Sequence, residues 1–228
     1  MRSVRCYTVI PVIVFSTLVV ACSLIMADEP KNILERMEIA YGEIRDYQTL
    51  VELRNYSEDG SFEVEEFLYT LKKPHWIRLD FKSPHSGMVI VYPDPRGRVV
   101  VRPSGFFHFL KFYLSPDDSR LVSRTGQRID ETDMGLLIEN IRHSVTDHRR
   151  GPVDLVSEDR RLIIRVLADD HFRKGVETRY AFTIDKDRWL PIGVSESTPE
   201  GRLERTIFFR DLRTNLTIPD SFFQMDGP

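Results

Sequence analysis

Cysteine is scarce in this chain. Only Cys6 and Cys22 are cysteines among its 228 residues, and both lie within the first 27 residues. The remainder therefore has neither a disulfide to cross-link it nor thiol chemistry. A chain of this length corresponds to about one domain and can bury a sufficient hydrophobic core without cross-links.

Catalytic and metal-binding motifs are missing as well. The patterns G-x-S-x-G, H-E-x-x-H, C-x-x-C and G-x-x-x-x-G-K do not occur. His143 and His148 are five residues apart, so they do not share a helix face for a metal ion. The polar triplet Asp169-Asp170-His171 fits a solvated turn better than a reactive site. We therefore expect a protein that is not an enzyme and that needs no cofactor or metal.

An excess of positive charge is also lacking. The formal net charge is −3, and residues 1–27 contribute two arginines and no acidic residue, which leaves 30 basic against 35 acidic residues, or −5, for the rest. A mildly acidic body argues against a nucleic-acid partner, because the phosphate backbone selects basic surfaces.

The one long apolar run lies at the N-terminus. Arg2 and Arg5 precede YTVIPVIVFSTLVVACSLIMA, which is typical of an export signal, so we divide the chain into a signal segment, 1–27, and a folded body, 28–228. Three outcomes stay open: lipidation of Cys22 at the VVAC box, cleavage after Ala27, and an uncleaved membrane anchor. Each predicts an exported body that is periplasmic or tethered to the envelope.

Periodicity in the body indicates two helices among many strands. Apolar residues recur at helical spacing in 30–45 and in 133–147, with Thr132 or Asp133 as the expected N-cap of the second helix. Strands are expected elsewhere; PHWIRLDFKSP, for example, alternates so that Ile77, Leu79 and Phe81 share one face. Meandering hairpins with one apolar face curl around that face.

The pattern predicts a mainly β, α+β fold. We expect an incomplete, half-open antiparallel barrel of about nine to eleven strands, covered by two or three helices that enclose a hydrophobic cavity.

The segment PSGFFHFLKFYLSP concentrates aromatic rings. Phe106 and Phe109 share one face if the segment is helical, which fits a core helix, but Phe107 and Phe112 then lie on other faces. The alternative is a lid or wall of a cavity that accepts acyl chains.

Several short motifs resemble the LolA-like superfamily of periplasmic lipoprotein carriers. Lys73-Pro74, the alternating apolar residues after it and Pro84 resemble its characteristic strand, and LTIPDSFFQM resembles its closing segment. An uncharacterised exported bacterial subfamily is similar in three further motifs. These are Pro103-Ser104-Gly105-Phe106-Phe107, Leu114-Ser115-Pro116-Asp117 and Gly135-Leu136-Leu137.

The resemblance covers roughly residues 30–223. It implies a cavity that binds lipid or the acyl chains of lipoproteins, with membrane-associated donor or acceptor proteins as partners. The alternatives are a regulatory module that senses envelope stress with the same fold, and a structural envelope protein without ligand. The internal arginine that closes the lid of the carriers is not assignable; Arg78 lies in the matching strand but on its polar face.

The candidate cavity residues are the apolar positions of the expected strands and helices. They are Ile77, Leu79, Phe81, Val89, Val91, Val99, Val101, Phe106, Phe109, Phe112, Leu137, Ile141, Tyr180 and Phe182. Opening of the cavity is expected to move either 104–114 or 133–147.

Overall fold

The computed structural model describes residues 29–147 and 151–225. The predicted signal segment 1–27, with Cys22, lies outside these residues. Within them, no helix has the length and apolar character needed to cross a membrane.

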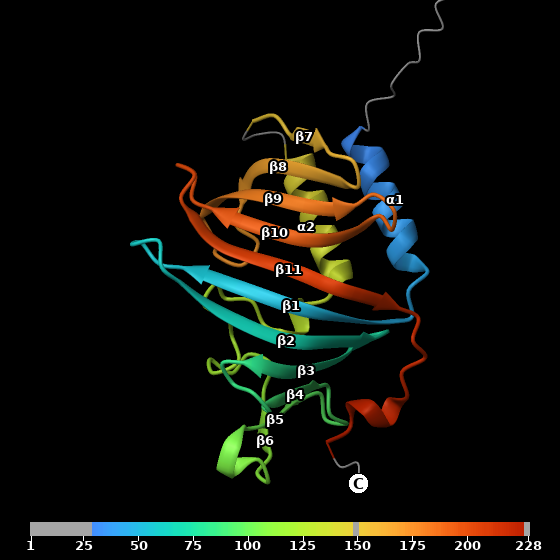
Figure 1. Ribbon diagram of the computed structural model, residues 1–228, viewed down its shortest axis with the longest axis vertical. Coiled ribbons are helices and arrows are strands. Elements are labelled where there is room, and N and C mark those ends of the chain that lie inside the picture. Colours follow the sequence, from blue (N-terminus) through green and yellow to red (C-terminus); the bar gives the residue numbers. More distant parts are fainter. Residues whose placement is uncertain (1–28, 148–150, 226–228) are drawn as a thin grey trace, which may run out of the picture.

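One antiparallel sheet of eleven strands forms the body of the molecule (Figure 1). The first six strands are β1 (Asp46–Tyr56), β2 (Phe62–Lys72), β3 (Trp76–Ser83), β4 (Val89–Tyr92), β5 (Val99–Arg102) and β6 (Phe112–Leu114). The other five are β7 (Asp154–Ser157), β8 (Arg161–Asp169), β9 (Glu177–Asp185), β10 (Leu190–Ser197) and β11 (Leu203–Thr214).

The strand order joins two meanders. It runs β6-β5-β4-β3-β2-β1-β11-β10-β9-β8-β7, so β1 pairs with β11 at the centre and β6 and β7 are the two edges. The sheet is therefore curved but not closed, and the predicted half-open antiparallel arrangement is confirmed.

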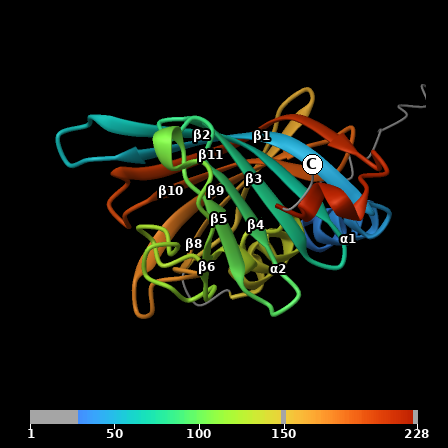
Figure 2. The same ribbon diagram turned by 90° about the horizontal axis from the view of Figure 1, so that it is seen from below.

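Two α-helices lie on the concave face of the sheet (Figure 2). They are α1 (Pro30–Gly42) and α2 (Met134–Thr146), close to the predicted ranges, and they contact each other as well as β8 and β10. The side chain of Asp133 caps α2 by accepting hydrogen bonds from the amides of Gly135 and Leu136 at 2.6 and 3.1 Å.

Gly135 permits the close contact of the two helices. A Cβ atom at this position would lie 2.6 Å from the Tyr41 ring of α1 and 2.8 Å from Asp133 Oδ1. The Tyr41 hydroxyl donates to the same Asp133 oxygen at 3.2 Å, so it closes the junction between α1 and the start of α2.

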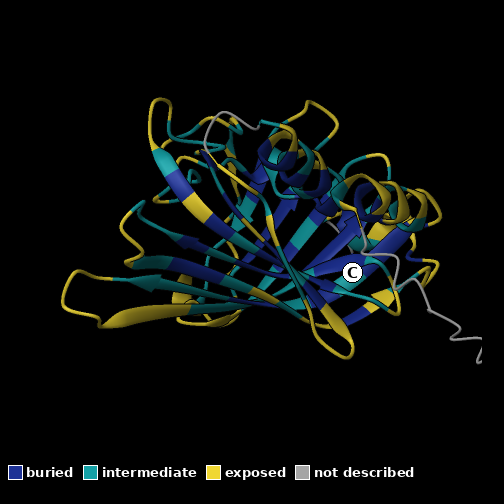
Figure 3. Cartoon of the chain, turned by 90° about the horizontal axis from the view of Figure 1, so that it is seen from above, coloured by how far each residue is buried: buried dark blue, intermediate teal, exposed yellow. Residues whose placement is uncertain are grey.

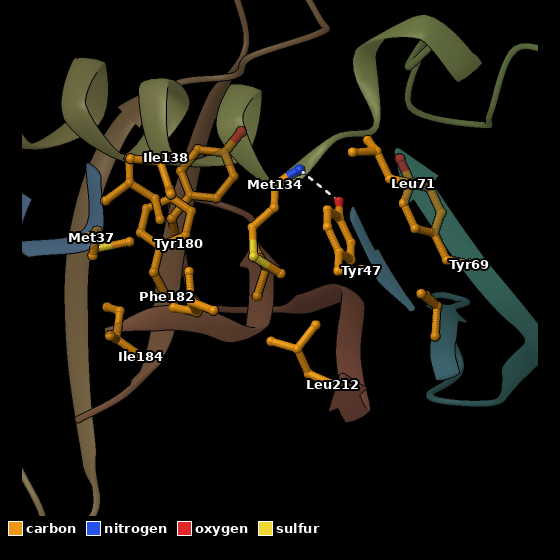
Figure 4. Packing of buried hydrophobic residues seen from close by; sticks show 14 of the residues in the cluster. Met37, Tyr47, Tyr69, Leu71, Met134, Ile138, Tyr180, Phe182, Ile184 and Leu212 are labelled. Carbon is orange, nitrogen blue, oxygen red and sulfur yellow. Dashed lines mark hydrogen bonds between the residues drawn. The ribbon is translucent and has the colours of Figure 1, made fainter. Parts of the chain in front are cut away.

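The main core lies on the concave face between the helices and the sheet, and it extends from β8–β11 across β1–β5 (Figures 3 and 4). Phe182, Ile184 and Ile141 are 0% exposed. At its border the Met134 amide donates to the buried Tyr47 hydroxyl at 3.1 Å, which fixes the start of α2 on β1.

A second, small core lies on the convex face. Val89 and Val91 pack there against Ile218 and Phe223 of the C-terminal segment, residues 215–225. The pairing of Leu79 with Ile90 explains this placement, because Ile90 then shares the concave face with Leu79 and its neighbours point away. The expectation that Val89 and Val91 line the same surface as Ile77 is therefore wrong.

Candidate functional site: a cavity under the crossing segment

The chain has to cross the concave face between the two sheet edges. Residues 115–133, here called the crossing segment, leave the edge strand β6 and lead into α2. They lie over the part of the sheet that the helices leave uncovered. A cavity of about 360 Å³ lies between this segment and strands β1–β4.

Nine of the twenty residues that line the cavity are apolar. The sheet contributes Leu53, Phe67, Leu79, Phe81 and Ile90, the β3–β4 turn contributes Met88, and the crossing segment contributes Leu121, Val122 and Ile129. The rings of Phe67 and Phe81 lie 5.2 Å apart in a tilted pair. These side chains offer hydrocarbon an apolar surface, while polar residues such as Glu65, Arg120 and Arg128 line the rest of the cavity.

One member of a buried ion pair, Arg205, lines this cavity. Arg205 and Glu196 are each 5% exposed, and Nη1 of Arg205 lies 3.8 Å from Oε1 of Glu196. Burial raises the pKa of Glu196, and the Arg205 charge opposes that rise. Nε of Arg205 is buried without a hydrogen-bond partner among the described residues.

Arg205 also holds the crossing segment. It donates to Thr125 Oγ1 at 2.6 Å and to Gln127 Oε1 at 3.0 Å. It shares its strand face with Ile207 and Phe209, which pack against the main core. A basic residue within an apolar strand face was a signal in the sequence, yet the candidate set omitted Arg205.

The other contacts of the crossing segment are mainly polar. Thr132 Oγ1 and the Tyr69 hydroxyl are 3.3 Å apart, and the His75 ring contacts the Asp130 carbonyl at 3.0 Å. Arg124 pairs with Glu63 at the surface. Ile129 of the segment is buried in the main core and Leu121 packs against it, but most of its other contacts are polar and partly exposed, which is typical of a segment that opens more readily than the core.

The interior of the helix-covered half of the concave face is closely packed. A void of about 50 Å³ lies within it, lined in part by Leu137, Tyr180 and Phe182, and a more open hollow of about 530 Å³ lies between the end of α2 and the end of β8. The rings of His171 and Tyr180 stack with centroids 4.4 Å apart, and Tyr180 in turn stacks on Phe182 at 5.2 Å.

One serine–histidine contact was not anticipated. Ser144 Oγ and His171 Nε2 are 2.8 Å apart, and Ser144 is 2% exposed. The neighbouring Asp170 carboxylate accepts from Arg173 and from Thr178 at 2.8 Å, so it serves the turn that follows β8. We interpret the contact as a hydrogen bond that satisfies two polar groups in the core.

The structure separates the candidate residues into groups. Leu79 and Phe81 line the cavity. The following candidates pack in or against the main core: Ile77, Val99, Val101, Leu137, Ile141, Tyr180 and Phe182. Their predicted contact with a ligand stays a prediction.

The aromatic segment lies away from the cavity. It forms a 3-10 turn, Gly105–Phe107, and then β6, where Phe112 pairs with Val101. Phe106, Phe109 and Phe112 are 81%, 63% and 44% exposed. The segment neither forms a core helix nor lines the cavity, so both interpretations are wrong.

A second hollow of about 660 Å³ lies on the convex face. Its walls include Trp76, Val91, Val100 and Tyr113, and Phe223 and Met225 of the C-terminal segment border it. It is thus the groove beside this segment rather than a space inside the half-barrel.

The molecule is an open antiparallel half-barrel whose concave face is filled by helices on one side and leaves an apolar cavity on the other. No family model and no curated protein sequence matches the chain. Solved structures do match it. They include a LolA superfamily protein from Nitrosomonas europaea, at TM-score 0.41 and 12% identity, covering 88% of this chain and 99% of that one.

Two other matches come from different bacteria. An outer membrane lipoprotein-sorting protein domain from Vibrio parahaemolyticus has TM-score 0.42 and 11% identity, covering 86% of this chain and 97% of that one. The Pseudomonas aeruginosa MucA/MucB complex has TM-score 0.45 and 18% identity over 86% of this chain. The chain spans 59% and 60% of the matched chains in two MucB complexes.

Structures of the LolA superfamily, which the sequence motifs resemble, are thus among those to which the chain is similar. At these scores and identities the likeness concerns the path of the chain and not the site.

Proposed function

We propose that the protein binds the hydrocarbon chain of a lipid or of an acylated lipoprotein in the cavity under the crossing segment. The observation that carries this proposal is the cavity of about 360 Å³, whose lining combines nine apolar residues with a buried arginine, Arg205. Its volume is within the range of about 300–1,000 Å³ typical of small-molecule sites.

The hydrophobic effect supplies the affinity. Each methylene group removed from water contributes about 0.8 kcal/mol, and the rings of Phe67 and Phe81 together with the side chains of Leu79 and Ile90 offer it an apolar surface. The unpartnered Nε of Arg205 supplies one hydrogen-bond donor for an ester or carboxyl oxygen of the ligand.

Access to the cavity requires movement of the crossing segment. Arg205 links its Thr125 and Gln127 to β11, and these bonds are exchangeable for bonds to a ligand oxygen. The helices need not move, because the main core beneath them is packed. This differs from the expectation that 104–114 or 133–147 moves on opening.

A dansyl-labelled fatty acid tests the proposal. Phe81→Gln combined with Met88→Gln places amides in the cavity wall and should weaken uptake at least tenfold, with the circular dichroism spectrum unchanged. The matched control is Trp76→Ala, which alters the convex groove instead and should leave uptake unchanged.

Two results would count against this site. Loss of uptake with Trp76→Ala alone would move the site to the convex groove. Absence of saturable uptake by the unmodified protein would favour the structural, ligand-free class.

A further inference from the structure

The aromatic tip, residues 105–113, protrudes from one edge of the sheet. Phe106, Phe107 and Phe109 are 81%, 56% and 63% exposed, and Phe112 and Tyr113 are 44% and 46% exposed. The Phe106 ring contacts those of Phe107 and Phe109 edge to face, at 5.6 and 6.2 Å. The three phenylalanines of the turn thus pack mainly on one another rather than on the core.

The fold does not need these rings for its own stability. Gly105, with φ of +68°, turns the chain away from β5, and a Cβ there would meet no atom within 4 Å, so the turn stands clear of its surroundings. The opposite edge strand, β7, ends instead in exposed Asp154 and Ser157. Clustered exposed rings at only one edge are typical of an interaction surface.

Basic residues flank the aromatic tip along the chain. Between Asp94 and Asp117 the chain has four basic residues, Arg96, Arg98, Arg102 and Lys111, and no acidic residue, whereas the whole protein has a net charge of −3. Arg98 pairs with Asp94 at 2.7 Å and lies 4.5 Å from the centre of the Tyr113 ring. Exposed rings beside cations match the interface of an anionic bilayer, where rings enter the headgroup region and cations contact phosphates.

We propose that the aromatic tip docks this edge of the sheet onto a membrane surface that contains anionic phospholipid. Phe106, Phe107 and Phe109 enter the boundary between headgroups and acyl chains, and Arg102 and Lys111 lie at the level of the phosphates. Charge complementarity favours this occupant over a second copy of the chain. Although the chain is acidic overall, a symmetric contact would place two basic tips against each other, and their like charges would repel.

Docking brings the cavity close to lipid. Arg102 pairs with Val89, and the residues just before Val89 on the chain, His85 and Met88, belong to the cavity wall. A tip seated in a bilayer therefore holds one side of that wall near the membrane surface. The docking does not depend on acyl-chain binding, and each is measured separately.

A tryptophan reporter tests the docking in the full chain. Phe107→Trp is mixed with vesicles of phosphatidylcholine and phosphatidylglycerol whose acyl chains are brominated, because bromine quenches only an indole that enters the acyl region. The matched control is Phe62→Trp on β2, since Phe62 is also an exposed ring, at 49%, and lies outside the tip. The signal of the native Trp76 and Trp189 is subtracted with the unmodified protein.

We expect at least a threefold greater quenching of the tip reporter than of the control reporter. Omission of phosphatidylglycerol, or the double change Arg102→Glu and Lys111→Glu, should remove most of this difference. Equal quenching of both reporters would show association through another part of the chain and overturn the proposal. An unquenched tip reporter whose emission shifts with protein concentration would overturn it in favour of a second copy.

Discussion

Over β8–β11 the concave face is covered by two helices, whereas over β2–β4 it is covered by the crossing segment (Figures 1 and 2). In the first half Phe182 is 0% exposed and the void beside it measures about 50 Å³; in the second half Phe81 is half-buried beside a cavity of about 360 Å³. Two layers of regular structure thus pack closely, and a less regular cover leaves a cavity.

The largest expected effect on stability comes from replacing one phenylalanine by alanine in each half of the concave face. Phe182→Ala should lower the free energy of unfolding by about 3–5 kcal/mol, because it removes a fully buried ring from a packed core. Phe81→Ala should cost less, about 1–2 kcal/mol, since its ring is only partly buried and borders a cavity. Urea denaturation measures both, and equal losses would contradict the division into a packed and an open half.

A smaller effect concerns pH and is confined to the packed half. Burial lowers the pKa of His171 from 6.5 to about 4, Asp170 opposes this shift and His143 adds to it. The folded state favours the neutral ring, so the contribution of His171 to the free energy of unfolding is complete above pH 6.5. Up to roughly 3 kcal/mol of it is lost as the pH falls toward 4.

The variant His171→Phe isolates this contribution. It keeps a stacked ring but does not titrate, so the difference in unfolding free energy between it and the unmodified protein should change between pH 7 and pH 4. Thermal denaturation at both pH values measures this difference, and a constant difference would show that His171 is not the responsible group.

Hydrogen exchange compares the two covers directly. The Gln127 amide, which donates to Ser123 Oγ within the crossing segment, should exchange at least a hundredfold faster than the Met134 amide bonded to buried Tyr47. Mass spectrometry with peptide resolution measures this. Equal protection would mean that the crossing segment opens only when the whole domain unfolds.

The smallest effect on stability is expected at the aromatic tip. Phe106→Ser should change the free energy of unfolding by no more than about 0.5 kcal/mol, because the ring is already 81% exposed. A larger loss, measured by urea denaturation, would show that the tip supports the fold.

The sequence was most informative where one face of an element is buried. Met134, Ile138, Ile141 and Val145 predicted α2 correctly because each is buried at helical spacing. The strand that contains Ile77, Leu79 and Phe81 was assigned correctly for the same reason, since strict alternation defines its two faces.

Other features depend on tertiary structure. The run GMVIVY is apolar throughout, so it does not reveal that Ile90 rather than Val89 or Val91 faces the cavity. Helical spacing in the aromatic segment was misleading, because Gly105 directs the chain into a turn and Tyr113 pairs with Val100. The crossing segment has no periodicity of its own, and its position follows from the two edges that it connects.

The central pairing of β1 with β11 has a consequence for the order of assembly. Residues 46–56 and 203–214 are separated by nearly the whole body, whereas the other neighbouring strands follow each other along the chain. During synthesis the first meander can therefore form while the outer edge of β1, eleven residues long, still has no partner. Contacts of such high sequence separation slow folding, and an open strand edge invites aggregation. Of the eleven strands of this sheet, the last to be synthesised is thus the one that protects the first.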